Sequence, residues 1–220
     1  MAKVLALVGM GPGVSAAVAR RFGREGYTIA ALARRADALR SEVARLASAG
    51  TTAHAYVADA ADAAGLEAAL GRIAAELGAP EVLVYNAYAA REQPLAQLDA
   101  ETLVAEFRVN VVGALVAAQA VLPAMRKAGS GTILVTGGGF ALEPIAPLAS
   151  LGVGKAGLRN LTASLHGELK DAGIHVATVT ICGYVKPATP FDPDRIAEVY
   201  WRLHCQGAGQ FEREVVFRGS

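Results

Sequence analysis

The stretch from Val4 to Ser15 reads VLALVGMGPGVS and decides the fold class of this 220-residue chain. Its first five residues form an uninterrupted apolar run, which is typical of a β-strand buried on both faces of a parallel sheet. Gly9 ends that run and opens a glycine-rich turn, after which Val14–Arg24 is predicted to be helical. The stretch therefore predicts the strand, turn and helix that open a βαβ unit.

The same alternation of β-rich runs and Ala-rich amphipathic segments continues to the end of the chain. Strands are predicted at Val4–Val8, Tyr27–Ala33, Thr52–Val57, Val82–Tyr85, Gly131–Thr136, His175–Ile181 and Val215–Arg218. Helices are predicted at Val14–Arg24, Asp37–Ala47, Ala64–Leu77, Thr102–Lys127, Leu148–Asp171 and Pro193–Gln206. No linker or repeat interrupts the pattern. We therefore expect one α/β Rossmann-fold domain over residues 1–220, a doubly wound seven-stranded parallel sheet with helices on both faces.

Composition excludes several classes of partner. A net charge of +1 gives no reason to expect nucleic acid or an anionic membrane. The longest apolar stretch, Val111–Met125, contains a glutamine and a proline and is short for a membrane span, so a buried helix is expected. Cys182 and Cys205 fit neither metal nor disulfide spacing, which predicts reduced thiols in a cytoplasmic protein without a metal site.

The glycine turn and the end of the second predicted strand indicate a nucleotide. Gly9, Gly11 and Gly13 would let the backbone approach a pyrophosphate, and the following helix N-terminus favours an anion. A tight turn without a ligand is the alternative. Arg34 directly follows the second strand, at a position where a carboxylate would favour NAD, so NADP(H) is expected in preference to NAD(H). Alternatively, Arg34 and Arg35 only solvate the next helix.

Five segments in this order resemble the short-chain dehydrogenase/reductase family, over about Lys3 to Gly219. The first is Gly9-x-x-x-Gly13-x-Ser15, in which Ser15 replaces a glycine and is expected to loosen the turn slightly. The others are Asp59 after the third strand, Asn86-Ala87 after the fourth, the helix around Lys155, and Cys182-Gly183 after the sixth. The resemblance implies that the nucleotide is bound by Gly9, Gly11, Gly13, Val14, Arg34, Asp59, Asn86, Ala87, Lys155, Gly183 and Val185.

The resemblance also implies a catalytic site with two of its members replaced. In the family a tyrosine exchanges the proton, a lysine assists it and holds the nicotinamide ribose, a serine orients the carbonyl and an asparagine supports a water. Asn110 and Lys155 match the asparagine and the lysine, whereas Leu151 stands in the tyrosine position and Gly138 in the serine position. The usual route for the proton is therefore expected to be lost.

Two tyrosines are the candidates for a substitute proton donor. Tyr88 and Tyr184 are predicted to flank the nicotinamide, although each has the simpler interpretation of an aromatic lining residue. Ser150 would point about 100° away around the helix. The connection after the sixth strand, Tyr184–Asp192, is short and rich in proline, so little of a substrate lid is expected.

Two functions remain open from the sequence. The first is an NADP(H)-dependent oxidoreductase acting on a small carbonyl or alcohol substrate, with Asn110, Lys155, Tyr88 and Tyr184 as candidate catalytic residues. The second is a catalytically silent NADP(H)-binding sensor or partner protein. In the family the two long helices, Thr102–Lys127 and Leu148–Asp171, pack between subunits, so a homodimer or homotetramer is expected.

Overall fold

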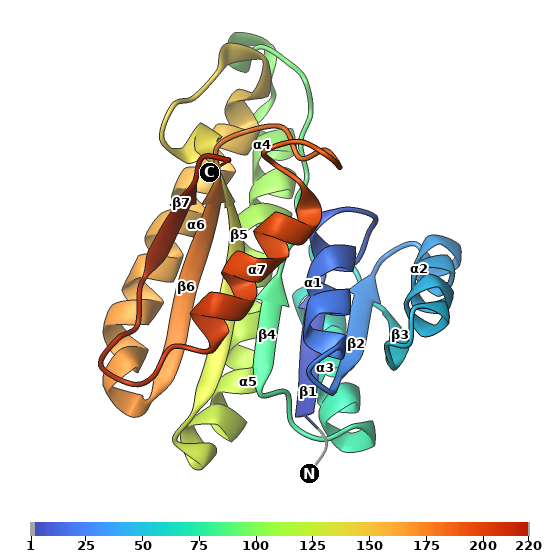
Figure 1. Ribbon diagram of the computed structural model, residues 1–220. Coiled ribbons are helices and arrows are strands. Elements are labelled where there is room, and N and C mark those ends of the chain that lie inside the picture. The colour runs from blue at the N-terminus through green and yellow to red at the C-terminus, as the bar shows by residue number, and fades with distance from the viewer. Residues whose placement is uncertain (1–2, 220) are drawn as a thin grey trace.

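The computed structural model describes residues 3–219 and contains a seven-stranded sheet in the order β3-β2-β1-β4-β5-β6-β7 (Figure 1). All neighbouring strands run parallel. The strands are β1 Lys3–Val8, β2 Tyr27–Ala33, β3 Ala53–Val57, β4 Val82–Tyr85, β5 Gly131–Gly138, β6 Ile174–Ile181 and β7 Glu214–Phe217. This order confirms the doubly wound sheet, and its direction of growth reverses between β1 and β4.

Helices cover both faces of the sheet, as expected. The helices are α1 Val14–Gly23, α2 Ala36–Ser48, α3 Ala63–Glu76, α4 Ala100–Phe107, α5 Gly113–Ala128, α6 Ala149–Leu169 and α7 Pro193–His204. One apolar core joins α1, α2 and α7 to the sheet, and a second core joins α3, α5 and α6 to the opposite face. In Figure 1, α1 and α7 lie in front of the strands.

The first strand shows why its sequence is apolar throughout. Leu5 and Leu7 belong to the core beneath α1 and α7, whereas Val4, Ala6 and Val8 belong to the other core. Successive side chains of a strand point to opposite faces, so a strand with helices on both sides needs apolar residues at every position. In register, Val8 lies beside Leu32 of β2 and Tyr85 of β4. The residues that follow these strands therefore meet at one edge of the sheet.

Local capping fixes where several helices begin. The side chains of Asp62, Asp99 and Asp192 accept hydrogen bonds from backbone amides in the first turns of α3, α4 and α7. An aspartate at this position satisfies amides that have no partner within the helix. Pro193 follows Asp192 in the first turn of α7, where its missing N–H costs nothing.

The predicted long helix Thr102–Lys127 is divided in the structure. A π-helical turn, Arg108–Val112, separates α4 from α5. The buried Tyr85 hydroxyl donates to the carbonyl of Val109, which explains why the regular helical pattern is interrupted there. A Cβ at Gly113 would also collide with that hydroxyl. The interruption therefore comes from a residue 24 positions away in the chain.

The helical run Ala100–Ala128 is long and apolar enough to cross a membrane by length and composition alone. Half of its most apolar window is nevertheless buried inside the protein. Its buried residues, among them Ala117, Val121 and Met125, belong to the core against the sheet. The apolar stretch predicted as a buried helix is thus part of the core.

Candidate active site

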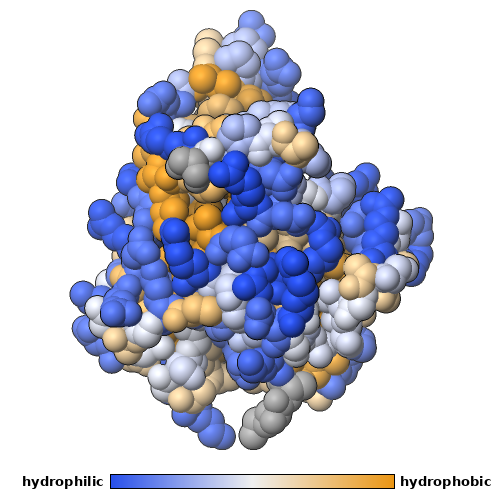
Figure 2. All heavy atoms as spheres, in the orientation of Figure 1, coloured by the Kyte–Doolittle hydropathy of each residue, from blue (hydrophilic) through white to orange (hydrophobic). Residues whose placement is uncertain are grey.

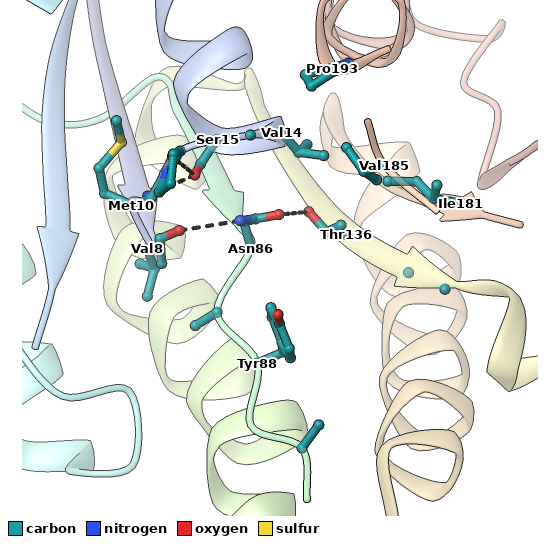
Figure 3. A pocket seen from close by; sticks show the side chains of 18 of the residues that line it. Val8, Met10, Val14, Ser15, Asn86, Tyr88, Thr136, Ile181, Val185 and Pro193 are labelled. Atoms are coloured by element: carbon teal, nitrogen blue, oxygen red, sulfur yellow. Dashed lines mark hydrogen bonds between the residues drawn. The ribbon is translucent and has the colours of Figure 1, made fainter. Parts of the chain in front are cut away.

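An open cleft of about 1860 Å³ crosses the carboxyl ends of the strands at the point where the strand order reverses (Figure 3). Open α/β sheets bind their ligands at this place. Every residue assigned to a site from the sequence lines the cleft, except Asn110. Those residues are Gly9, Gly11, Gly13, Val14, Arg34, Asp59, Asn86, Ala87, Tyr88, Lys155, Gly183, Tyr184 and Val185.

The glycine turn is pinned between two strands. The backbone amides of Gly9 and Met10 both donate to the carbonyl of Leu32, at 2.9 Å each. Gly9 has a φ of 91°, and a Cβ there would collide with the backbone of Ala87. Glycine is required at this position both for its conformation and for the close approach of the segment that follows β4.

Ser15 tightens this turn, and the expected loosening is wrong. Its buried hydroxyl accepts a hydrogen bond from the Gly11 amide and donates one to the Gly11 carbonyl, both at 3.0 Å. These bonds fold the turn onto the first turn of α1, whose amino end faces the cleft (Figure 3). A helix N-terminus beside a fixed glycine turn is a ready site for a phosphate group.

Two arginines follow the end of β2 at the rim of the cleft. Arg34 and Arg35 are exposed, and within residues 3–219 neither forms an ion pair. The nearby Asp37 pairs with Arg40 instead. Two unpaired guanidinium groups at this position can bind a phosphate through paired hydrogen bonds.

Asp59 and Asp62 have different structural roles. Asp59 lines the cleft and accepts the backbone amide of Ala61 at 2.9 Å, so its carboxylate is held at the cleft edge. Asp62 caps α3 by accepting the Gly65 amide at 3.1 Å.

Asn86 joins the glycine turn to β5. Its amide nitrogen donates to the carbonyl of Gly9 at 3.2 Å, and its amide oxygen accepts from the Thr136 hydroxyl at 2.8 Å (Figure 3). The Thr136 oxygen also lies 2.7 Å from the hydroxyl of the buried Tyr200. Because the Thr136 proton goes to Asn86, Tyr200 donates to Thr136. Sequence reasoning missed this chain, since Tyr200 lies on α7, far from every recognised motif.

Lys155 lies in the floor of the cleft. Its side chain is buried, and its Nζ donates to the carbonyl of Thr136 at 2.6 Å. Burial away from water lowers the pKa of Lys155 from 10.5 to about 8. Within residues 3–219 no carboxylate pairs with this ammonium. Its remaining donors are therefore available to a ligand in the cleft.

Leu151 and Gly138 surround Lys155. Leu151 lies one helical turn before Lys155 on α6, is 7% exposed and lines the cleft. Gly138 ends β5 beside the lysine side chain, and a Cβ there would meet its nearest neighbour, Cγ of Lys155, at an ordinary 3.6 Å. An apolar side chain and an open space thus adjoin the ammonium group.

The two candidate tyrosines differ in their relation to Lys155. The Tyr88 ring lies over the ammonium, with Nζ 5.9 Å from the ring centroid, a distance at which the cation is attracted to the ring. In Figure 3 the Tyr88 side chain points into the pocket. Tyr184 is 85% exposed at the rim, whereas the aromatic ring over the Lys155 ammonium is that of Tyr88. The structure brings Tyr88, and not Tyr184, next to the lysine.

Asn110 does not reach the cleft. It is buried in the π-helical turn, where its amide oxygen accepts the Ala89 amide at 2.9 Å and its amide nitrogen donates to the Ala89 carbonyl at 2.8 Å. Both polar atoms are thus used on the backbone next to Tyr88. In this structure the Asn110 side chain positions that segment.

The segment after β6 forms a compact rim. A Cβ at Gly183 would collide with the Phe191 ring, so the chain folds closely back on itself. The Asp192 carboxylate accepts the Ala188 amide at 2.6 Å and the Asp194 amide at 2.8 Å. Val185 turns towards the cleft from this rim (Figure 3). The short connection predicted from the sequence contains no helix between β6 and α7.

These features define a nucleotide-binding α/β domain. A glycine turn faces the start of a helix, two exposed arginines lie at one end of the cleft, and a buried ammonium lies further along it. Within residues 3–219 no group of three or more histidines, cysteines or acidic residues is placed to hold a metal ion.

The comparisons with known proteins identify the family. The family model for short chain dehydrogenases matches residues 3–196. Oxidoreductase asL5 of Sarocladium schorii is 31% identical over 174 residues, which are 79% of this chain and 69% of that protein. The 2,3-dihydro-2,3-dihydroxybenzoate dehydrogenase of Bacillus subtilis is 30% identical over 218 residues, 99% of this chain and 78% of that one.

A solved structure shows the same architecture. A metagenomic short-chain oxidoreductase in complex with NADP superposes with a TM-score of 0.89 at 28% identity, over 98% of this chain and 96% of that one. The chain belongs to the short-chain dehydrogenase/reductase family of oxidoreductases.

Proposed function

We propose that the protein is an NADP(H)-dependent oxidoreductase that interconverts a carbonyl compound and its alcohol. The observation that carries the proposal is one cleft with the unpaired Arg34 and Arg35 at one end and the Lys155 ammonium in its floor. The arginines fit the 2′-phosphate, the glycine turn fits the pyrophosphate, and Lys155 fits the nicotinamide ribose. The NADP complex of the related metagenomic oxidoreductase supports this choice of cofactor.

Arg34→Ala is expected to weaken NADPH binding by about 10- to 100-fold, the value of one hydrogen-bonded charge pair. NADH lacks the 2′-phosphate, so its affinity should change little. Fluorescence titration of both nucleotides measures the two effects. Arg40→Ala is the matched control, because Arg40 lies on the following helix α2, pairs with Asp37 and does not line the cleft. An equal loss of NADH affinity would refute the assigned role of Arg34.

The catalytic site is proposed to work without the family's tyrosine and serine, whose positions are Leu151 and Gly138. NADPH supplies the hydride when bound. The Tyr88 hydroxyl then donates its proton to the carbonyl oxygen as that oxygen gains charge, and the Lys155 ammonium stabilises the phenolate that remains. Tyr88 is 63% exposed, so solvent can return the proton.

Tyr88→Phe is expected to lower kcat by about 100-fold and to leave NADPH affinity nearly unchanged, because only the hydroxyl group that donates the proton is removed. Tyr184→Phe serves as the control and should change kcat less than about threefold, since its ring lies in solvent. Steady-state reduction of a panel of ketones and aldehydes measures both. NADPH binding without turnover of any substrate would instead favour a silent nucleotide-binding protein.

A homodimer or homotetramer is also part of the proposal. Val104, Val112 and Val153 are 45%, 38% and 42% exposed on α4, the π-helical turn and α6, three elements that pack against one another. Sedimentation velocity should show an oligomer that Val104→Glu combined with Val153→Glu converts to a monomer. Val57→Glu is the control, because Val57 is exposed on the distant β3. An unchanged oligomer in the double variant would exclude this interface.

The expected compartment is the cytoplasm. Cys182 and Cys205 are both free thiols in the structure. Free thiols are usual in a reducing compartment. Localising a tagged copy of the protein in its own cells tests this part of the proposal.

A further inference from the structure

We propose that the substrate end of the cleft takes an uncharged ketone or aldehyde with an extended apolar body. This inference rests on the proposed function and names its substrate class. Beyond Lys155 and Gly138, one wall of the cleft is formed by Phe140, Leu142, Ile145, Leu148 and Leu151, here called the apolar wall.

The apolar wall is solvent-accessible in part. Ile145 is 43% exposed, and the Tyr88 and Tyr184 rings that also line the cleft are 63% and 85% exposed. Figure 2 shows hydrophobic residues near the top of the molecule and a larger group on its left side, where Figure 1 places β7 and α6. Apolar surface that lines a concave site next to a few polar groups is the usual environment of a small apolar ligand.

The same end of the cleft offers few partners to a polar substrate. Its lining residues from Gly138 to Leu151 and from Gly183 to Pro187 include no serine, threonine, asparagine or glutamine. Its charged residues are Glu143 and Arg218, which are exposed and opposite in sign. A sugar or polyol would leave several hydroxyl groups without hydrogen-bond partners there, which is costly.

The apolar wall is held in place without a ligand. Gly152 of α6 packs against the segment carrying Phe140, where an added Cβ would meet the Phe140 carbonyl oxygen at 3.3 Å. The backbone amide of Gln93 donates to the Pro147 carbonyl at 3.0 Å. This bond connects the apolar wall to the segment after β4. The cleft is open, and its compact rim Tyr184–Asp192 contains no helix between β6 and α7.

The experiment uses the NADPH-loaded protein and two probe series. Straight-chain 2-ketones of increasing length are tested for kcat/KM, and straight-chain primary amides, whose carbonyl is not reduced, are tested for binding by calorimetry. Each added methylene should raise kcat/KM for the ketones and the binding affinity for the amides by about threefold to fourfold. Cyclohexanone should also be preferred to tetrahydropyran-4-one, which has the same ring shape and one ether oxygen.

Three variants test which residues produce the dependence on chain length. Ile145→Asn and Leu148→Asn should flatten the dependence on chain length, whereas Leu95→Asn should not, because Leu95 is exposed but does not line the cleft. No dependence on length, or a preference for the ether or for hydroxylated ketones, would overturn the inference. The amide series separates the two proposals, since it reports the apolar site even if no substrate is reduced.

Discussion

Replacing Leu151 by tyrosine in the Tyr88→Phe variant is expected to raise kcat for NADPH-dependent carbonyl reduction by about 100-fold or more, the usual contribution of a general acid. Leu151 and Lys155 lie one turn apart on α6 and both line the cleft. A phenol at position 151 would lie near the ammonium, which stabilises the phenolate left after proton transfer. Adding Gly138→Ser should raise kcat further, because a side chain fits there in ordinary contact with Lys155.

Steady-state kinetics on one ketone panel tests this gain. Leu151→Phe is the matched control, since it adds the ring without the hydroxyl and should give no increase. Equal kcat values for the tyrosine and phenylalanine variants would mean that a group at position 151 does not reach the reacting oxygen. In the chain that keeps Tyr88 the gain should be smaller, because the proposed donor is already present.

Lys155→Met is expected to weaken NADPH binding by about 10- to 100-fold and yet to stabilise the fold. Burial lowers the pKa of Lys155 to about 8 in the folded chain, whereas an unfolded lysine titrates near 10.5. Below pH 8 the folded state therefore holds a buried charge, at a cost of roughly 1–3 kcal/mol once the bond to Thr136 is considered. The variant removes that cost together with the ribose contact.

The pH dependence has a definite sign. Between pH 8 and 10.5 the unfolded chain binds more protons at this site than the folded chain, so wild-type stability should rise relative to Lys155→Met as the pH increases. NADPH affinity of the wild type should fall over the same interval, because the ammonium becomes neutral. Urea unfolding and NADPH titration at about pH 7 and pH 10 measure both changes. If the free energies of unfolding of the wild type and of Lys155→Met change equally with pH, the lysine is not buried as described.

The sequence predicts the sheet and the nucleotide end of the cleft well, because both depend on local signals. Val4–Val8 is apolar at every position since both faces of β1 are covered, and Gly9 must be glycine because Ala87 lies against it. The apolar run is predicted from the alternation of side chains along a strand. The glycine is predicted from a general rule for turns between a strand and a helix. Arg34 is assigned by its position after β2 alone.

The catalytic end is predicted less completely, because its geometry depends on distant contacts. The π-helical turn comes from Tyr85, and the amide of Asn110 is used on Ala89, 21 residues away. Tyr88 and Tyr184 look equivalent in the sequence, and only the fold places one of them over Lys155. Tyr200 reaches Thr136 across 64 residues, a pairing that no local pattern reveals.

The compact rim between β6 and α7 also has a kinetic consequence. Asp192 fixes this segment through the Ala188 and Asp194 amides, so the segment is not expected to act as a lid that opens before the product leaves. In enzymes with a closing lid, lid opening or product release often limits turnover. Here the chemical step itself is expected to be the slow one. Replacing the transferred hydrogen of the cofactor by deuterium should therefore slow steady-state turnover directly, and changes to the proton donor should appear undiminished in kcat.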